Sequence, residues 1–106
     1  MFYFDSDGEH TKTTVRTEHC RVKNAHIINP NTSDAYVQLF NKLVADITVG
    51  ATVPDYVWFV PAQGALEVSY GDGALNFDVA LAVACTTTAT GSGDPTTGLT
   101  VSIEVA

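Results

Sequence analysis

The chain has 106 residues, the size of a single domain, and 45% of them are hydrophobic while only 16% are charged. Its 12 acidic and 5 basic residues give a formal net charge of -7, which disfavours nucleic-acid binding because a phosphate backbone needs clustered lysine and arginine. So few charges on a small domain favour a surface that is partly covered in an assembly, although a surface rich in threonine, serine and asparagine is the alternative.

Residues 1–12 have the character of an extended arm. Phe2, Tyr3 and Phe4 precede a polar, acidic stretch that contains Gly8, and such a segment has too little apolar surface to fold independently. Burial of each aromatic side chain contributes roughly 1.5–3 kcal/mol. We therefore expect the arm to dock on its own domain, on a neighbouring subunit or on a larger partner.

Residues 13–29 predict one long strand or two short ones, and the Pro- and Asn-rich residues that follow predict a turn. Residues 34–47 fit two templates. Their apolar positions have helical spacing, and periodicity alone narrowly favours a helix. The alternation over residues 34–41 and the strands expected on both sides favour a strand there instead.

Further strands are expected in the second half of the chain. A short β segment at residues 46–50 precedes residues 55–61, where Tyr56, Trp58 and Val60 share one face and the opposite face is also apolar. Two apolar faces indicate a central strand, or a strand with one face at an interface. The remaining strand-like segments are residues 66–70, 77–85 and 99–105.

The small side chains Ala80, Ala82 and Ala84 line one face of the predicted strand at residues 77–85, where they would let another sheet or subunit approach closely. We expect seven or eight strands and no helical crossovers. The sequence therefore predicts an all-β fold, an antiparallel β-sandwich of jelly-roll or Greek-key type over residues 13–106, preceded by the extended N-terminal arm.

The basic residues all lie in the first part of the chain, at Lys12, Arg16, Arg21, Lys23 and Lys42. If residues 12–23 form one strand face, these bases can contact an acidic partner surface. The alternative is that the charges only keep an edge strand soluble.

No motif for catalysis or metal binding is apparent. Asp5 begins a stretch that resembles a calcium loop, but an EF-hand needs glycine at its sixth position and an acid at its twelfth, where this chain has His10 and Arg16. The histidines and cysteines lack metal-ligand spacing, and no nucleophile elbow, phosphate loop or zinc-protease motif occurs. We expect a protein that is not an enzyme and that holds no cofactor or metal.

Cys20 and Cys85 could pair across a sandwich. The chain has no secretory signal at its start, which favours two free buried thiols and a protein made soluble in a cytoplasm. Its longest apolar run, residues 79–85, is too short to cross a bilayer, so no membrane partner is expected. Trp58 with Tyr56 could form a platform on which a sugar stacks, and burial of Trp58 in the core or at a subunit interface is the competing interpretation.

Several segments resemble small structural proteins of tailed bacteriophages. The similarity covers roughly residues 20–106, and its motifs are structural and specify no reaction. The first 12 residues depart from the family's pattern. The resemblance also favours the strand over residues 34–41. The similar segments are Asn29-Pro30-Asn31-Thr32-Ser33, Ala35-Tyr36-Val37-Gln38-Leu39-Phe40, Val49-Gly50-Ala51-Thr52-Val53-Pro54, Phe59-Val60-Pro61-Ala62, Gly73-Ala74-Leu75-Asn76-Phe77 and Ala82-Val83-Ala84-Cys85-Thr86-Thr87-Thr88.

The resemblance implies a jelly-roll-like virion protein, in the first place a head decoration, or cement, protein. Such a protein binds the major capsid protein on the outside of the capsid, commonly as a trimer, and stabilises the assembled shell. A neck, tail or head-fibre component is the alternative within the virion, and a carbohydrate-binding module is the alternative outside it. The candidate interface residues are Phe2, Tyr3, Phe4, Arg16, Arg21, Lys23, Tyr56, Trp58 and Val60.

Overall fold

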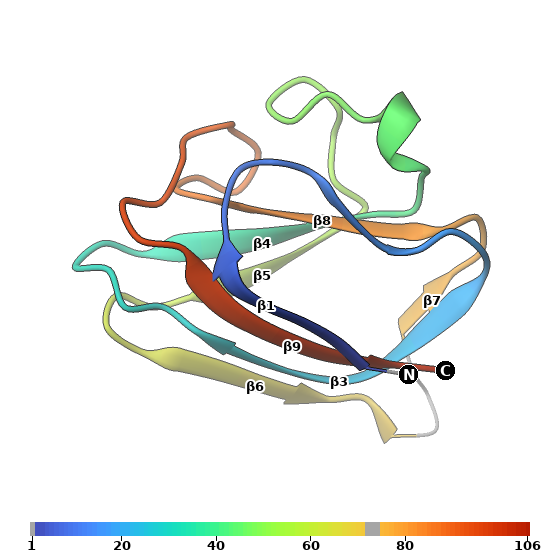
Figure 1. Cartoon of the computed structure of the whole chain (residues 1–106), viewed down its shortest axis with the longest axis horizontal. Helices are drawn as coiled ribbons and strands as arrows, with labels where there is room; N and C mark the ends of the chain where they lie inside the picture. The colour runs from blue at the N-terminus through green and yellow to red at the C-terminus, as the bar shows by residue number, and fades with distance from the viewer. Residues whose placement is uncertain (1, 72–74) are drawn as a thin grey trace.

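The computed structural model describes residues 2–71 and 75–106. These residues form nine strands and one short 3-10 helix, η1 (Val44–Asp46). The strands make two antiparallel sheets that pack face to face as two layers (Figure 1), which confirms the predicted all-β sandwich. No helix within the described residues is long and apolar enough to span a membrane.

Sheet A has the strand order β1-β9-β3-β6, with β7 also paired to β3, and sheet B has the order β2-β8-β4-β5. Most consecutive strands lie in opposite sheets, and β4 and β5 are consecutive strands that pair directly. Sheet A contains β1 (Phe2–Gly8), β3 (Cys20–Ile28), β6 (Ala65–Ser69), β7 (Leu75–Phe77) and β9 (Leu99–Val105). Sheet B contains β2 (Thr13–Arg16), β4 (Ala35–Phe40), β5 (Tyr56–Val60) and β8 (Leu81–Thr86).

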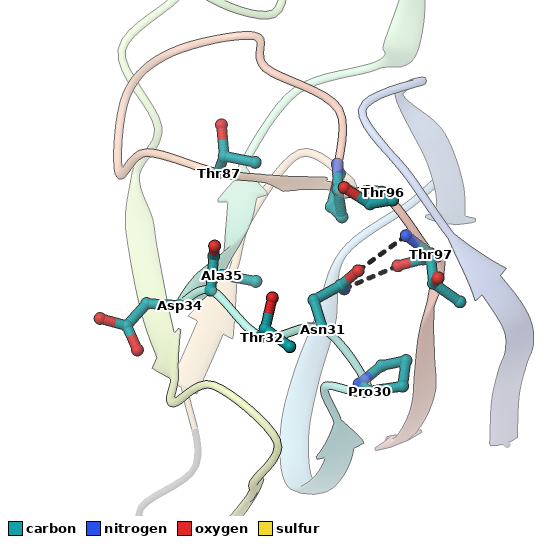
Figure 2. Close-up of a pocket in the computed structure, with 10 residues that line it drawn as sticks. Pro30, Asn31, Thr32, Asp34, Ala35, Thr87, Thr96 and Thr97 are labelled. Atoms are coloured by element: carbon teal, nitrogen blue, oxygen red, sulfur yellow. Dashed lines mark hydrogen bonds between the residues drawn. The ribbon is translucent and has the colours of Figure 1, made fainter.

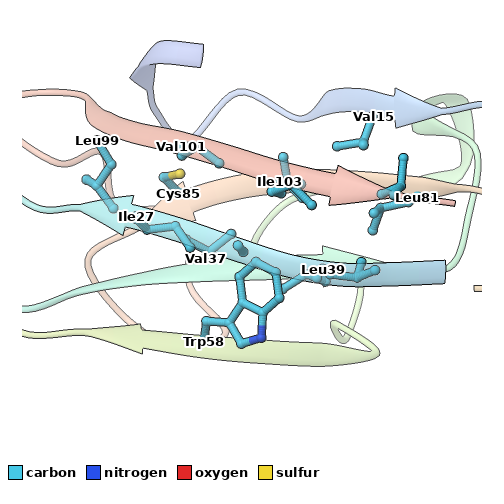
Figure 3. Packing of buried hydrophobic residues seen from close by; sticks show 14 of the residues in the cluster. Val15, Ile27, Val37, Leu39, Trp58, Leu81, Cys85, Leu99, Val101 and Ile103 are labelled. Atoms are coloured by element: carbon cyan, nitrogen blue, oxygen red, sulfur yellow. The ribbon is translucent and has the colours of Figure 1, made fainter. Parts of the chain in front are cut away.

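The hydrophobic core fills the space between the two sheets (Figure 3). Strand β9 shows why these residues form a sandwich, because its buried residues alternate with half-exposed polar ones. Its buried residues are Leu99, Val101, Ile103 and Val105. From sheet B, Val37, Leu39 and Trp58 belong to the same buried cluster.

The first residues differ from the predicted arm, because residues 2–8 form β1, an edge strand of sheet A antiparallel to β9. Phe2 lies opposite Glu104 and Phe4 opposite Ser102, so the two ends of the chain run side by side (Figure 1). The segment therefore docks on its own domain through backbone pairing, which its polar composition does not reveal. Gly8 allows the end of β1 to lie close to Cys85, since a Cβ at position 8 would lie 2.9 Å from the Cys85 sulfur.

Three local expectations are settled by the structure. Residues 13–29 form two strands, β2 and β3, and the ambiguous segment forms strand β4 rather than a helix. The β segment predicted at residues 46–50 is wrong, because η1 and a turn closed by a hydrogen bond from Ala51 N to Thr48 O occupy this region.

The single strand predicted over residues 77–85 is also wrong, because the chain changes sheets within it, from β7 in sheet A to β8 in sheet B. At the crossing, the Asn41 side-chain oxygen accepts hydrogen bonds from the backbone N–H groups of Val79 and Ala80 at 2.8 and 3.4 Å. Backbone groups in this connection therefore bond to a side chain rather than to a neighbouring strand.

Loops of the same chain cover the part of the outer face of sheet B that lies over Phe40, Ala82 and Ala84. Phe40, Ala82 and Ala84 point away from the core, yet they are buried against Ile47 from the connection between β4 and β5. Gln38 is also fully buried on this face. The alanine face that could have received another subunit is thus occupied by the chain itself.

Candidate functional site

The outer face of sheet A stays open, in contrast to that of sheet B. We call it the bare face and define it by the outward residues of β1, β9, β3 and β6, which are exposed or half-exposed. The strand registers arrange them in cross-strand rows. The rows are Phe2–Glu104–Asn24–Ser69, Phe4–Ser102–His26–Glu67 and Thr100–Ile28–Ala65.

Two aromatic side chains form the free edge of the bare face. Phe2 is 71% exposed and Phe4 is 66% exposed. Both lie on β1, whose other edge pairs with no strand among the described residues. Tyr3 points to the opposite side and packs against the core. Its hydroxyl donates a hydrogen bond to the Asp5 carboxylate at 3.4 Å. The predicted aromatic candidates are therefore divided, with two exposed rings and one inward ring.

Three of the four strands of the bare face carry balanced charges on a protein that is acidic as a whole, whereas β1 adds the acids Asp5 and Asp7. Strands β3, β6 and β9 carry two bases, Arg21 and Lys23, and two acids, Glu67 and Glu104. Their formal charges cancel, whereas the whole chain has a net charge of -7. The Asn24 amide also donates a hydrogen bond to Glu104 at 2.6 Å, which helps to hold that carboxylate in place.

The remaining interface candidates do not join this face. Arg16 lies at the end of β2 in sheet B, where its guanidinium is 3.2 Å from the Glu18 carboxylate. Trp58 is only 3% exposed and Val60 is fully buried, so both side chains pack inside the chain's own core. They present no surface to a partner, and Trp58 offers no platform to a sugar.

Tyr56 is 41% exposed on β5, and its side chain interacts with that of Tyr70, which directly follows β6. Phe59 of the same strand is 48% exposed, and its ring centroid lies 5.5 Å from that of Tyr36. Neither Tyr36 nor Phe59 was among the candidate interface residues. The alternation of residues 55–61 does place Phe59 on the face opposite Trp58, which is the signal that could have identified it.

A polar cleft lies at one end of the sandwich, between residues 30–35 and residues 87–97 (Figure 2). Its volume is about 260 Å³. Asn31 joins the two sides, because its side-chain nitrogen donates to the Thr97 carbonyl at 2.8 Å while its oxygen accepts from the Thr97 N–H at 2.7 Å. The cleft is lined by Pro30, Asn31, Thr32, Ser33, Asp34, Ala35, Thr87, Pro95, Thr96 and Thr97.

Asn29 fixes the position of Asn31 through hydrogen bonds. Its side chain is buried, and its oxygen accepts hydrogen bonds from the backbone and side-chain nitrogens of Asn31 at 3.0 and 2.9 Å. Its nitrogen donates to the carbonyls of Ser33 and Val60 at 2.9 and 3.2 Å. This network means that the cleft wall is formed without a ligand.

Both cysteines are free and buried, and burial raises the pKa of the Cys85 thiol to about 12. Within residues 2–71 and 75–106, no group of three or more His, Cys, Asp or Glu side chains could hold a metal ion. Comparison of the chain with protein-family models, curated proteins and solved structures finds no significant match.

Proposed function

We propose that this chain is a structural virion protein, without enzymatic activity, that binds the outside of a phage capsid and stabilises the assembled shell. The observation that carries the proposal is the bare face with its aromatic edge. The resemblance to tailed-phage structural proteins supports the choice of partner, the major capsid protein.

The exposed rings favour contact with another protein surface. Phe2 and Phe4 leave most of their area in water, and burial of such a side chain contributes roughly 1.5–3 kcal/mol. Large exposed apolar residues side by side, rimmed by polar ones, are typical of interaction surfaces. The polar rim here is supplied by Asn24, Ser102 and Glu104.

The charge distribution also favours the bare face as the surface that contacts the capsid. The balanced charges of β3, β6 and β9 reduce the repulsion that this face would meet from an acidic protein surface, although Asp5 and Asp7 of β1 add negative charge at its edge. Sheet B is less suited to the role, because its own loops already fill much of its outer face.

Attachment to a lattice suits the energetics of a small domain. A protein that binds the assembled shell but not its separate subunits adds its binding free energy to the stability of the shell. Many copies, or an oligomer that engages several sites, raise the total further through multivalency. We expect a homo-oligomer, in the first place a trimer, which light scattering would report at about 34 kDa against 11.3 kDa for one chain.

The test uses the genome that encodes this chain. Mass spectrometry should detect the protein in purified particles that the intact genome produces. Heads produced after deletion of its gene should lose their contents at a lower temperature than intact heads. Adding the purified protein back should restore the heads. Absence of the protein from the particles, or deletion heads of unchanged stability, would refute the proposal.

A matched pair of variants tests the surface itself. Phe2→Ser with Phe4→Ser should abolish recovery of the protein with the deletion heads. Val53→Ser with Val79→Ser removes exposed apolar side chains of 75% and 55% exposure elsewhere and should leave recovery unchanged. Equal loss with both pairs would argue against the bare face as the docking surface, and labelling at the neck or tail would favour the alternative virion location.

A further inference from the structure

We infer that the polar cleft at the end of the sandwich is a binding site for a neutral saccharide, one or two sugar rings in size. The cleft lies in loops that follow β3 and precede β9, and it uses no residue of the bare face. The inference is therefore independent of capsid attachment.

The cleft is already formed in the unliganded chain. Asn31 holds the two loops together through two hydrogen bonds to the backbone of Thr97, and the buried Asn29 fixes Asn31 in turn. A site formed in advance avoids the entropy cost of ordering loops on binding. This matters most for a small ligand, which makes few contacts to offset such a cost.

The free polar groups of the cleft are hydroxyls. Within the described residues, the hydroxyls of Thr32, Ser33, Thr87 and Thr96 have no hydrogen-bond partner. In the close-up, those of Thr32 and Thr96 point into the space between the loops (Figure 2). Hydroxyls both donate and accept, so they match the vicinal hydroxyls of a sugar, which need both kinds of partner.

Charge excludes the anionic ligands. The cleft has no basic side chain among its lining residues, and its one charged residue is Asp34. One Asp34 oxygen already accepts the Ala62 N–H at 3.0 Å, which leaves the other as an acceptor. Phosphate or sulfate would meet a carboxylate without any counter-charge, on a chain whose net charge is -7.

The apolar residues and the size complete the match. Ala35 and Pro95 are buried beneath the cleft, whereas Pro30 is exposed at its rim and offers C–H surface to the apolar face of a sugar ring. The volume of about 260 Å³ falls just below the range of sites for drug-sized ligands, which is roughly 300–1,000 Å³. One or two rings are the corresponding size.

The experiment is an NMR titration of the isotope-labelled chain with glucose, galactose, mannose and N-acetylglucosamine up to tens of millimolar. We expect saturable amide shifts in residues 31–34, 96 and 97 with at least one sugar, and none with inorganic phosphate. No saturable shift with any of the four sugars, equal shifts with phosphate, or shifts centred elsewhere would overturn the inference.

Isosteric variants separate a binding role from a structural one. Thr96→Val and Thr32→Val keep the side-chain volume and remove one hydroxyl, so each should weaken binding about three- to tenfold, the effect of one lost hydrogen bond. Thr100→Val, on the bare face, should not change the affinity. Unchanged affinity in both cleft variants, with spectra that report an intact fold, would contradict the assignment.

Discussion

Trp58 donates a hydrogen bond from its indole Nε1 to the hydroxyl oxygen of Tyr70, 2.9 Å away. Trp58 lies on β5 in sheet B, and Tyr70 directly follows β6 in sheet A. The bond therefore links the edges of the two sheets on one side of the sandwich. It also satisfies the only polar atom of a side chain that is otherwise buried in the core.

This link predicts coupling between the two residues. Trp58→Phe removes the donor and part of the buried volume, and should lower the free energy of unfolding by about 1–3 kcal/mol. Tyr70→Phe removes only the acceptor and should cost about 1–2 kcal/mol, because it leaves the indole N–H unpaired. Urea unfolding followed by circular dichroism measures both changes.

The double variant decides whether the hydrogen bond is responsible. Once Trp58 is phenylalanine, Tyr70→Phe can no longer remove the bond to the indole, so the double variant should be less destabilised than the sum of the single changes. Strict additivity would mean that the two side chains contribute independently and that the bond does not tie the sheets together.

Gln38 predicts a second, local effect. Its side-chain nitrogen donates to the Thr86 hydroxyl at 2.8 Å and to the Gly91 carbonyl at 2.9 Å. The Thr86 hydroxyl itself donates to the Thr88 carbonyl at 2.7 Å, so it can only accept from Gln38. These two acceptors fix the amide orientation and leave its oxygen buried without a partner in the described residues.

Gln38→Ala should therefore increase the mobility of the loop after β8 more than it destabilises the core. We expect a loss of about 1–3 kcal/mol and faster hydrogen exchange at the Thr87 amide, which donates to Gly93 O. The amide of Ile27, in the centre of sheet A, serves as the internal reference. Equal acceleration at both amides would indicate global unfolding rather than release of the loop.

Strand β1 predicts an alternating pattern of stability effects. Tyr3 packs on the core whereas Phe2 and Phe4 face solvent, so Tyr3→Ser should cost about 1–3 kcal/mol. Phe2→Ser and Phe4→Ser should each change stability by less than about 0.5 kcal/mol. Thermal unfolding of the three variants is sufficient, and similar losses in all three would mean that the exposed rings also stabilise the isolated chain.

The strand content could be predicted from sequence because β-branched and aromatic runs between turns are local signals. The helical spacing of Leu39, Phe40 and Ile47 misleads for a physical reason. Leu39 faces the core, Phe40 faces outward, and Ile47 returns in a loop to cover Phe40. Both faces of the strand are buried, so the period-two pattern that marks a half-exposed strand is lost.

The candidate surface could be predicted only in part. Phe2 and Phe4 are visible as costly exposed side chains, but their grouping with residues of β3 and β9 depends on long-range pairing. Trp58 looks equally available in the sequence, and its burial depends on sheet A closing over it. The cleft combines residues 30–35 with residues 87–97, a proximity that no local pattern reports.

Alkaline pH supplies the last prediction, through Cys85 and Tyr3. Burial raises the pKa of Cys85 from 9.0 to about 12. Burial, with the nearby Asp5 charge, raises the pKa of Tyr3 from 10.0 to about 12. The folded state therefore holds both protons more tightly than the unfolded state. The stability that these two groups contribute is fully present below their pKa values in the unfolded state. It is lost as the pH rises from about 9 toward 12.

The urea concentration at the unfolding midpoint should thus decrease as the pH is raised from about 8 to about 11. Cys85→Ala should reduce that fall, because it removes a thiol that titrates near pH 9 in the unfolded chain but only near pH 12 in the folded one. Cys20→Ala is the weaker control, since its thiol also has a raised pKa through burial but lies near the positive charge of Arg16, which opposes the shift. A midpoint that does not change with pH in the unsubstituted protein would show that the two buried groups do not limit its alkaline stability.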